Sequence, residues 1–255
     1  MQNKQFLCLL AIVEVSLVHR CFSGVDPVPH YTDPSFIAKM LDQHNWYRAR
    51  AQPYASNMLY MSWDKRLAKL ASIWVEECIF RPNAHIKDPE MAHPEFKSIG
   101  EIFWVGQGYA KINPVAAWHS QEAFYDLTTN TCTKNCDHYR QLMWADSYKL
   151  GCAAHWCPGI EAYEVGKTGI IYVCHYGPKG NIRGRKPFIE GEACSLCKNE
   201  KCLENMCRNE ERDKVKDNED WSPSSGPGLS YDLQCITISV FGPLLMLLSY
   251  RTDYF

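Results

Sequence analysis

Cysteine is the residue type with the most evident chemistry in this chain. Ten of its thirteen cysteines fall between Cys78 and Cys207. The last four are closely spaced, and they fit two interpretations, a zinc site built from thiolates or a pair of disulfides: Cys194, Cys197, Cys202 and Cys207. The even number and the wide scatter of the other six favour disulfides. Because disulfides persist in oxidising compartments, we expect an extracellular protein.

Residues 1–23 support that compartment because they have the pattern of a secretory signal peptide. Lys4 precedes an apolar stretch over residues 6–18, and Ser23 is a small residue that suits cleavage. Cleavage there removes Cys8 and Cys21. Cys235 lies apart in the C-terminal apolar run, so the other ten cysteines form an even set.

A carboxylate interrupts a predicted apolar helix face in the middle of the chain. Asn113-Pro114 has the residues of an N-cap followed by proline at the first helical position. Helical spacing then puts four side chains on one face: Val115, Trp118, Glu122 and Tyr125. A glutamate in this position lies either at the edge of the core or in a polar cavity.

The sequence otherwise contains few signs of catalysis. It has no G-x-S-x-G and no H-E-x-x-H sequence, so it lacks the usual signatures of serine hydrolases and zinc proteases. The net charge of −2 gives no basic footprint for nucleic acid, and we expect no such partner. Hydrophobic residues make up 46% and aromatic residues 13%, which is enough for a folded core.

The elements that must position these residues are four helices and three strands. Apolar spacing and capping residues predict helices over about 34–50, 67–78, 114–125 and 137–144, the second of which presents Cys78 inward. Residues 99–105, 150–155 and 169–176 have strand patterns, and the last is apolar on both faces and therefore central. Without a regular βαβ order, we expect an α+β fold with helices on a mixed or antiparallel sheet.

The C-terminal part has a different composition. Residues 191–208 form a small cysteine-rich module that needs covalent staples, and residues 209–232 are predicted to be an extended stalk. An uncharged apolar run over 233–250 then fits three structures: a membrane-spanning helix of minimum length, a glycolipid-attachment signal or a buried core helix. N-glycosylation is not expected unless the rare Asn-x-Cys sequence at Asn130 is used.

Two segments resemble the signatures of the CAP superfamily (cysteine-rich secretory, antigen 5 and pathogenesis-related proteins). Cys136-Asp-His-Tyr-Arg-Gln-Leu-Met-Trp144 is similar to the first, and Val173-Cys-His-Tyr-Gly-Pro-Lys-Gly-Asn181 to the second. The similarity covers about residues 33–190 in the correct order, and it includes His44, Asn45 and Arg48. The cysteine module and stalk most resemble the glioma pathogenesis-related subgroup of that family.

The resemblance implies an α-β-α sandwich followed by a short cysteine-rich hinge. It also implies five disulfides: Cys78 with Cys157, Cys152 with Cys174, Cys194 with Cys202, Cys197 with Cys207, and Cys132 with Cys136.

The family groove contains two histidines and two glutamates that bind zinc in some members. The matching positions here are Glu101, Glu122 and His138, whereas Pro82 stands where the family has its first histidine. The three remaining residues would bind zinc weakly. A catalytic zinc needs three well-placed protein ligands, and two carboxylates do not replace the geometry of the missing imidazole. His85 is a poor substitute because Pro82 constrains the backbone before it.

The prediction from sequence is therefore a non-enzymatic recognition protein with no required cofactor, tethered to the extracellular face of the plasma membrane or secreted. Its expected partner is a sterol, another lipid or a cell-surface protein, as on sperm or immune cells. The alternative is a metal-dependent hydrolase that uses Glu101, Glu122 and His138. A channel regulator ranks last, because such relatives have ten cysteines in the C-terminal module and this chain has four.

Overall fold

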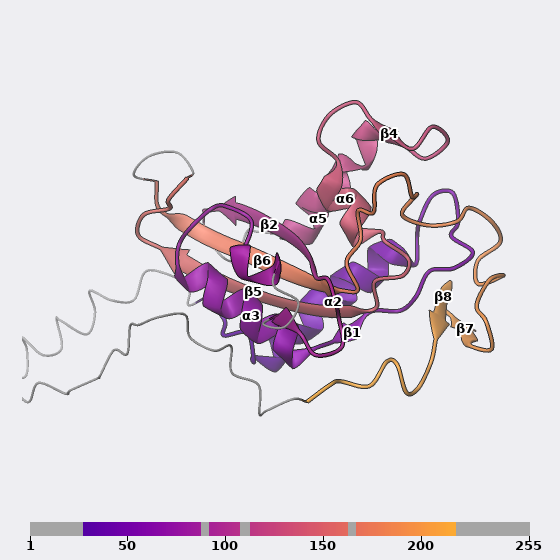
Figure 1. The fold of residues 1–255 in the computed structure, drawn as a ribbon, viewed down its shortest axis with the longest axis horizontal. Helices are drawn as coiled ribbons and strands as arrows, with labels where there is room; N and C mark the ends of the chain where they lie inside the picture. Colours follow the sequence, from indigo (N-terminus) through magenta and orange to yellow (C-terminus); the bar gives the residue numbers. More distant parts are fainter. Residues whose placement is uncertain (1–27, 88–91, 108–112, 163–166, 218–255) are drawn as a thin grey trace, which may run out of the picture. The chain divides into compact units, whose positions relative to one another are not determined.

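The computed structural model describes residues 28–87, 92–107, 113–162 and 167–217, which are coloured in Figure 1. The predicted signal peptide, the apolar run over 233–250 and the stalk beyond residue 217 lie outside these residues. Within the described segments, no helix combines the length and the apolar character that crossing a membrane requires.

A four-stranded mixed sheet forms the centre of the fold, in the order β1-β5-β6-β2. The strands are β1 (Ser62–Trp63), β2 (Gly100–Gly106), β5 (Lys149–Cys157) and β6 (Gly169–Gly177). β6 pairs antiparallel with both β5 and β2, and β1 runs parallel to β5. Every residue of β6 is buried, which confirms the central strand predicted over 169–176.

Helices cover both faces of the sheet (Figure 1). One face packs against α2 (Pro34–Arg48), α5 (Pro114–His119) and α6 (Asp137–Leu142), and the other against α3 (Lys65–Glu76). Alternate residues of β6 enter the two cores, so that Tyr172 and Cys174 face α2 while Ile171 and Val173 face α3. This arrangement is the predicted α-β-α sandwich.

Aspartates start the two long helices. Asp33 Oδ1 accepts hydrogen bonds from the backbone N–H groups of Ser35 (2.7 Å) and Phe36 (3.4 Å), and Pro34 occupies the first position of α2. Asp64 caps α3 in the same way. The first turn of α3 packs closely against β5 at Gly151. A Cβ atom at this position would lie 2.1 Å from the Ala68 nitrogen, so only glycine fits there.

Three polar residues of α2 hold the sandwich together. Both ends of the Asn45 amide bond the Met61 backbone at 2.9 Å. His44 Nδ1–H donates to Met40 O (2.6 Å), and its Nε2 accepts from the Tyr176 hydroxyl (2.8 Å). The buried Arg48 guanidinium donates to five carbonyl oxygens: those of Leu59, Leu142, Trp144, Ala145 and Ser147. Their role is therefore structural.

Two predicted helices end earlier than their apolar patterns suggest. α3 ends at Glu76, and Cys78 lies beyond it in the left-handed region (φ 55°), so the prediction that this cysteine is helical was wrong. α5 ends at His119 and continues as a 3₁₀-helix, η3 (Ser120–Phe124). The helical turns become tighter at η3, because the residues that follow leave the helix to form a hairpin. Its strands are β3 (Tyr125–Asp126) and β4 (Thr131–Cys132).

The C-terminal cysteine module packs directly on the sandwich. Its hairpin, β7 (Lys201–Leu203) and β8 (Met206–Arg208), buries Met206 and Cys207. The Cys207 N–H donates to Met58 O (2.8 Å), and the Tyr60 N–H donates to Cys207 O (3.1 Å).

All five disulfides implied by the resemblance are present, namely Cys78–Cys157, Cys132–Cys136, Cys152–Cys174, Cys194–Cys202 and Cys197–Cys207.

The first part of the predicted stalk also lies against the sandwich. Nζ of the buried Lys149 donates to Lys214 O (2.6 Å) and to the Ser62 hydroxyl (2.7 Å). Lys216 forms an isolated β-bridge with Asp64. Residues 209–217 therefore belong to the folded domain.

Candidate functional site

Glu101 lies on β2 directly opposite His175 of β6. Its Oε2 is 2.9 Å from His175 Nε2, and its Oε1 accepts a hydrogen bond from the Asn83 backbone N–H, also at 2.9 Å. The His175 side chain is fully buried, and that of Glu101 is 5% exposed. Both carboxylate oxygens are thus occupied by groups of the protein itself.

The partners of His175 determine how many protons this pair holds. His175 Nδ1 lies 3.2 Å from the carbonyl oxygen of Leu67, which can only accept a hydrogen bond. Nε2 faces a carboxylate, so both ring nitrogens must donate unless Glu101 itself carries the proton. In either form a proton lies between the two side chains, so Glu101 and His175 are a buried hydrogen-bonded pair with a further hydrogen bond at each end.

The segment around Pro82 is held in place beside this pair. The Arg81 carbonyl accepts a hydrogen bond from Trp74 Nε1 (3.0 Å), and the Arg81 guanidinium pairs with Glu161. Asn83 is buried, and its side chain accepts from the His85 N–H (2.8 Å). Next to Pro82, where the resemblance implies a histidine, the backbone N–H of Asn83 donates to Glu101.

His85 does not replace the missing histidine. It is exposed, on the short 3₁₀-helix η1 (Ala84–Lys87), and its ring packs edge-on against Trp74 with the ring centroids 6.1 Å apart. The expectation that His85 is a poor substitute agrees with this placement.

Glu122 is placed by the 3₁₀-helix η3, outside the apolar face predicted for it. The Tyr139 hydroxyl donates to its Oε1 at 3.4 Å, and His119 Nδ1 lies 3.9 Å from its Oε2. The side chain is 43% exposed, so Glu122 lies at the edge of the core. Burial and the nearby negative charge raise the pKa of Tyr139, which keeps its hydroxyl protonated as a donor.

His138 interacts with a glutamine and not with the two glutamates. It lies in the first turn of α6, and its Nδ1 accepts from the Gln121 amide at 3.1 Å. The same amide oxygen accepts from the backbone N–H groups of His138 (3.1 Å) and Tyr139 (3.4 Å). Burial lowers the pKa of His138, and Asp137 partly opposes this effect.

The predicted zinc ligands therefore each have other partners. Among the described residues, the ligand atoms of Glu101, Glu122 and His138 do not all lie within 4.8 Å of one another, the spacing that a shared metal ion requires. The arrangement does not fit a three-ligand zinc site. Zinc binding by these residues stays a prediction that metal analysis would test.

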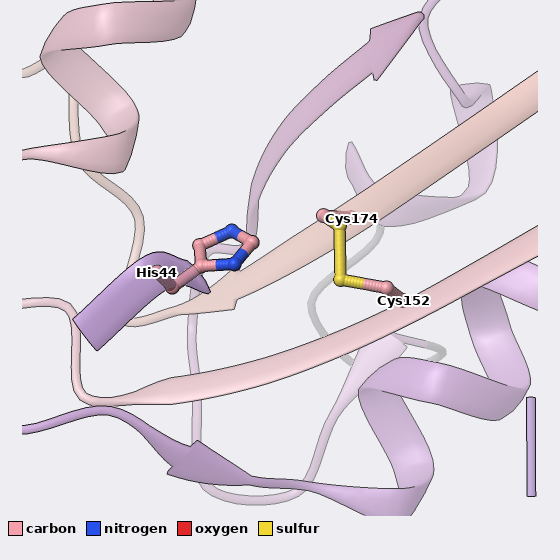
Figure 2. A group of neighbouring side chains, drawn as sticks. All are labelled: His44, Cys152 and Cys174. Carbon is pink, nitrogen blue, oxygen red and sulfur yellow. A yellow bond between two sulfur atoms is a disulfide. The ribbon is translucent and has the colours of Figure 1, made fainter. Parts of the chain in front are cut away.

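One group of potential ligands does meet that spacing in the described part of the chain: His44, Cys152 and Cys174. Figure 2 shows the His44 ring beside the two sulfurs, which are joined in a disulfide. A disulfide sulfur is not a thiolate, and both His44 nitrogens already have partners. Burial lowers the pKa of His44 to about 3 and keeps the ring neutral. This group is structural.

Sequence reasoning missed three residues that contact Glu101 or Glu122: Asn83, His119 and His175. His175 lies inside the second signature, and its neighbour Cys174 was assigned only to a disulfide. The pairing of Glu101 with His175 depends on the register between β2 and β6, which no local pattern fixes. His119 stacks on Tyr47 with ring centroids 4.1 Å apart, a contact between two helices distant in sequence.

Comparison with known proteins agrees with this fold. Residues 41–176 match the family described as "CAP: Cysteine-rich secretory protein family". Human GLIPR1-like protein 1 is 39% identical over 184 residues, which cover 71% of this chain and 74% of that protein. Mouse glioma pathogenesis-related protein 1 is 39% identical over 191 residues, covering 74% and 70%. The chain belongs to the CAP family.

Solved structures show the same fold at lower identity. Na-ASP-1 matches with a TM-score of 0.54 and 21% identity over 72% of this chain and 52% of that one. The structure of NaASP2 with Zn²⁺ matches with a TM-score of 0.51 and 22% identity, covering 72% and 100%. The zinc in that structure is bound by NaASP2.

Proposed function

We propose that this chain is a non-enzymatic extracellular recognition protein. The observation that carries the proposal is the state of Glu101, whose two carboxylate oxygens are bonded by His175 and the Asn83 N–H in a buried site. A general base must reach a substrate proton or an attacking water. The Glu101 side chain is only 5% exposed and both of its oxygens are bonded to the protein, so it lacks an open approach for that role.

The names of relatives support the same conclusion. Human peptidase inhibitor 16, 33% identical over 75% of this chain, and human peptidase inhibitor R3HDML, 34% identical over 75%, are named as inhibitors and not as enzymes. The family is described as secretory, which agrees with the predicted signal peptide and with the five disulfides.

Assays for hydrolysis distinguish recognition from the alternative, a metal-dependent hydrolase. The purified full chain would be tested on peptide and ester substrates with and without added Zn²⁺. We expect no turnover above a heat-denatured control. Zinc-dependent turnover that disappears in His138→Ala would overturn the proposal and establish the hydrolase.

A direct assay tests the recognition function itself. The full chain, labelled with a fluorophore, should bind the surface of intact cells saturably, and unlabelled chain should compete with it. Pretreating the cells with trypsin distinguishes a protein partner from a lipid, because only protein-dependent binding is lost. Binding to sterol-containing vesicles would indicate the sterol or lipid partner. Absence of both cell and vesicle binding would contradict the recognition function.

Tethering to the membrane is part of the proposal and depends on residues 233–250. A chain expressed on cells should be lost from the surface after treatment with phosphatidylinositol-specific phospholipase C if a glycolipid anchors it. Retention would favour a membrane-spanning segment. Recovery of all the protein in the medium would show instead that the chain is secreted without an anchor.

A further inference from the structure

A polar, aromatic pocket lies where the end of α2 meets the β7–β8 hairpin. It has a volume of about 610 Å³, within the range of small-molecule sites. Its lining includes the aromatic residues Trp46, Tyr54 and Tyr60 and the carboxylates of Asp42 and Glu204. Glu101, Glu122 and His138 do not line this pocket.

The two modules hold this pocket in a fixed shape. Asn205 Nδ2, at the tip of the hairpin, donates to Ala49 O at 3.0 Å, just after the end of α2. The Arg208 guanidinium lies 3.5 Å above the Tyr60 ring, and Cys207 is linked to Cys197. A rigid pocket loses little conformational freedom when a ligand binds.

Glu204 occupies a backbone position that suits it poorly. Glu204 (φ 51°) and Asn205 (φ 59°) are the two central residues of the hairpin turn, and both adopt the left-handed region. Such turns favour Gly, Asn or Asp at both positions. Asn205 fits this preference and bonds to α2, whereas Glu204 is exposed and has no hydrogen-bond or ion-pair partner among the described residues. A glutamate at a strained backbone position, with its carboxylate exposed beside the pocket, is a candidate for contacting a ligand.

The exposed aromatic rings give the pocket a flat apolar surface. Trp46 is 52% exposed and Tyr54 51% exposed, although aromatic side chains are usually buried in a core or an interface. Arg50 lies over one face of the Trp46 ring at 4.4 Å, and the exposed fraction of 52% is what the ring keeps beside that contact. With Arg208, Arg50 places two cations beside the two carboxylates. The formal charges balance, so the pocket selects neither an anion nor a cation by net charge.

We infer that this pocket binds a neutral sugar ring of a glycan. A pyranose has an apolar C–H face that packs on aromatic rings such as Trp46 and Tyr54. Its hydroxyl groups both donate and accept hydrogen bonds. Asp42 and Glu204 offer unused acceptors, and the Arg50 guanidinium offers donors, since only its Nη1 has a backbone partner, Trp46 O. The inference rests on the proposed recognition function and names the chemistry that it recognises.

Binding to a glycan array tests the inference. The full chain would be applied to immobilised neutral oligosaccharides of glucose, galactose, mannose and N-acetylglucosamine, and the best disaccharide would then be titrated in solution. We expect saturable binding of at least one neutral glycan. Trp46→Ala should weaken it by about tenfold or more, because it removes the stacking surface.

Glu204→Gly separates a binding role from a structural one. Glycine adopts the left-handed region without strain, so this variant should melt at the same or a higher temperature than the parent chain. The same variant should bind the disaccharide about tenfold more weakly, because the carboxylate is lost. Trp156→Ala is the matched control, since Trp156 is 41% exposed on β5 and does not line the pocket.

Three results would overturn the inference: no binding to any neutral glycan, binding that Trp46→Ala and Glu204→Gly leave unchanged, or binding confined to sulfated glycans or to trimethylammonium ligands. If the chain still binds cells in any of these cases, the recognition function stands and only the glycan assignment fails. If binding to cells and to sterol-containing vesicles is also absent, both fail.

Discussion

At the scale of residues, Glu101 differs from a metal ligand because both of its carboxylate oxygens are bonded to protein groups. Glu101→Gln removes the charge opposite His175 while keeping the size of the side chain. We expect it to lower the free energy of unfolding by about 3 kcal/mol, as is typical when one partner of a buried pair is removed. Urea unfolding monitored by tryptophan fluorescence would measure the change.

Glu122→Gln is the control for that variant. Glu122 is 43% exposed and its contacts are 3.4 and 3.9 Å long, so the same substitution should cost less than about 1 kcal/mol. Equal losses for the two variants would mean that the buried contact between Glu101 and His175 contributes no more to stability than the exposed contacts of Glu122.

Histidine burial sets the pH dependence of stability. The pKa of His44 falls from 6.5 to about 3 in the folded protein because the ring is buried. Between these pH values the unfolded chain binds more protons than the folded one, so stability decreases as the pH falls from about 6.5 towards 3. Burial also lowers the pKa values of His119 and His138, which act in the same direction.

Measuring unfolding at several pH values tests this effect. A fully titrating His44 would contribute a slope of up to about 1.4 kcal/mol per pH unit. His44→Gln should be less stable at pH 7, because it disturbs the bonds to Met40 and Tyr176, but its stability should fall less steeply below pH 6.5. A variant with the parent slope would show that other groups cause the acid sensitivity.

At the scale of elements, disulfides tie together segments that are far apart in the sequence. Cys78–Cys157 joins the end of α3 to β5 across 79 residues, whereas Cys132–Cys136 spans only 4. Loop-closure entropy gives about 4.5 kcal/mol for the long link and about 2 kcal/mol for the short one. Replacing both cysteines of the long link with alanine should therefore lower the melting temperature more.

The second variant replaces both Cys132 and Cys136 with alanine. It is the control for the first, because each variant loses one disulfide and two cysteines and only the length of the closed loop differs. Differential scanning calorimetry would give both melting temperatures. A larger loss for the Cys132–Cys136 variant would contradict the entropic account and indicate that this link orders the β3–β4 hairpin and the start of α6.

At the scale of the whole molecule, residues 209–217 decide where the folded domain ends. Lys149 donates to Lys214 O, Lys65 pairs with Asp217 at 2.5 Å, and burial lowers the pKa of Lys149. A chain that ends after Arg208 leaves the buried Lys149 ammonium without one of its two acceptors. It should be less stable by about 2 kcal/mol than a chain ending after Asp217.

The two truncated chains should be compared by urea unfolding with the full chain, all with the signal peptide removed. A chain ending after Asp217 should match the full chain, because it keeps every contact that the structure describes for this segment. Equal stability of all three would show that residues 209–217 contribute nothing and that the stalk begins at residue 209.

The sequence alone determined much of this protein. Asp33-Pro34 and Asn113-Pro114 placed the starts of α2 and α5, and a run of apolar residues identified the central strand β6. These signals are local, since caps and period-two patterns act within a few residues. The resemblance to the CAP family implied the sandwich and the five disulfide pairs, which the structure confirms. The structure moved Cys78 out of α3 and Glu122 out of α5.

Only the tertiary structure decided which contacts Glu101 and Glu122 make. Glu101 meets His175 because β2 and β6 pair in one register, and Glu122 turns to the surface because the chain tightens before the β3–β4 hairpin. The pocket at the hairpin depends on contacts between residues about 150 positions apart, such as Asn205 with Ala49 (156 apart). Contacts at such separations form only when the whole core packs, so no local pattern in the sequence encodes them.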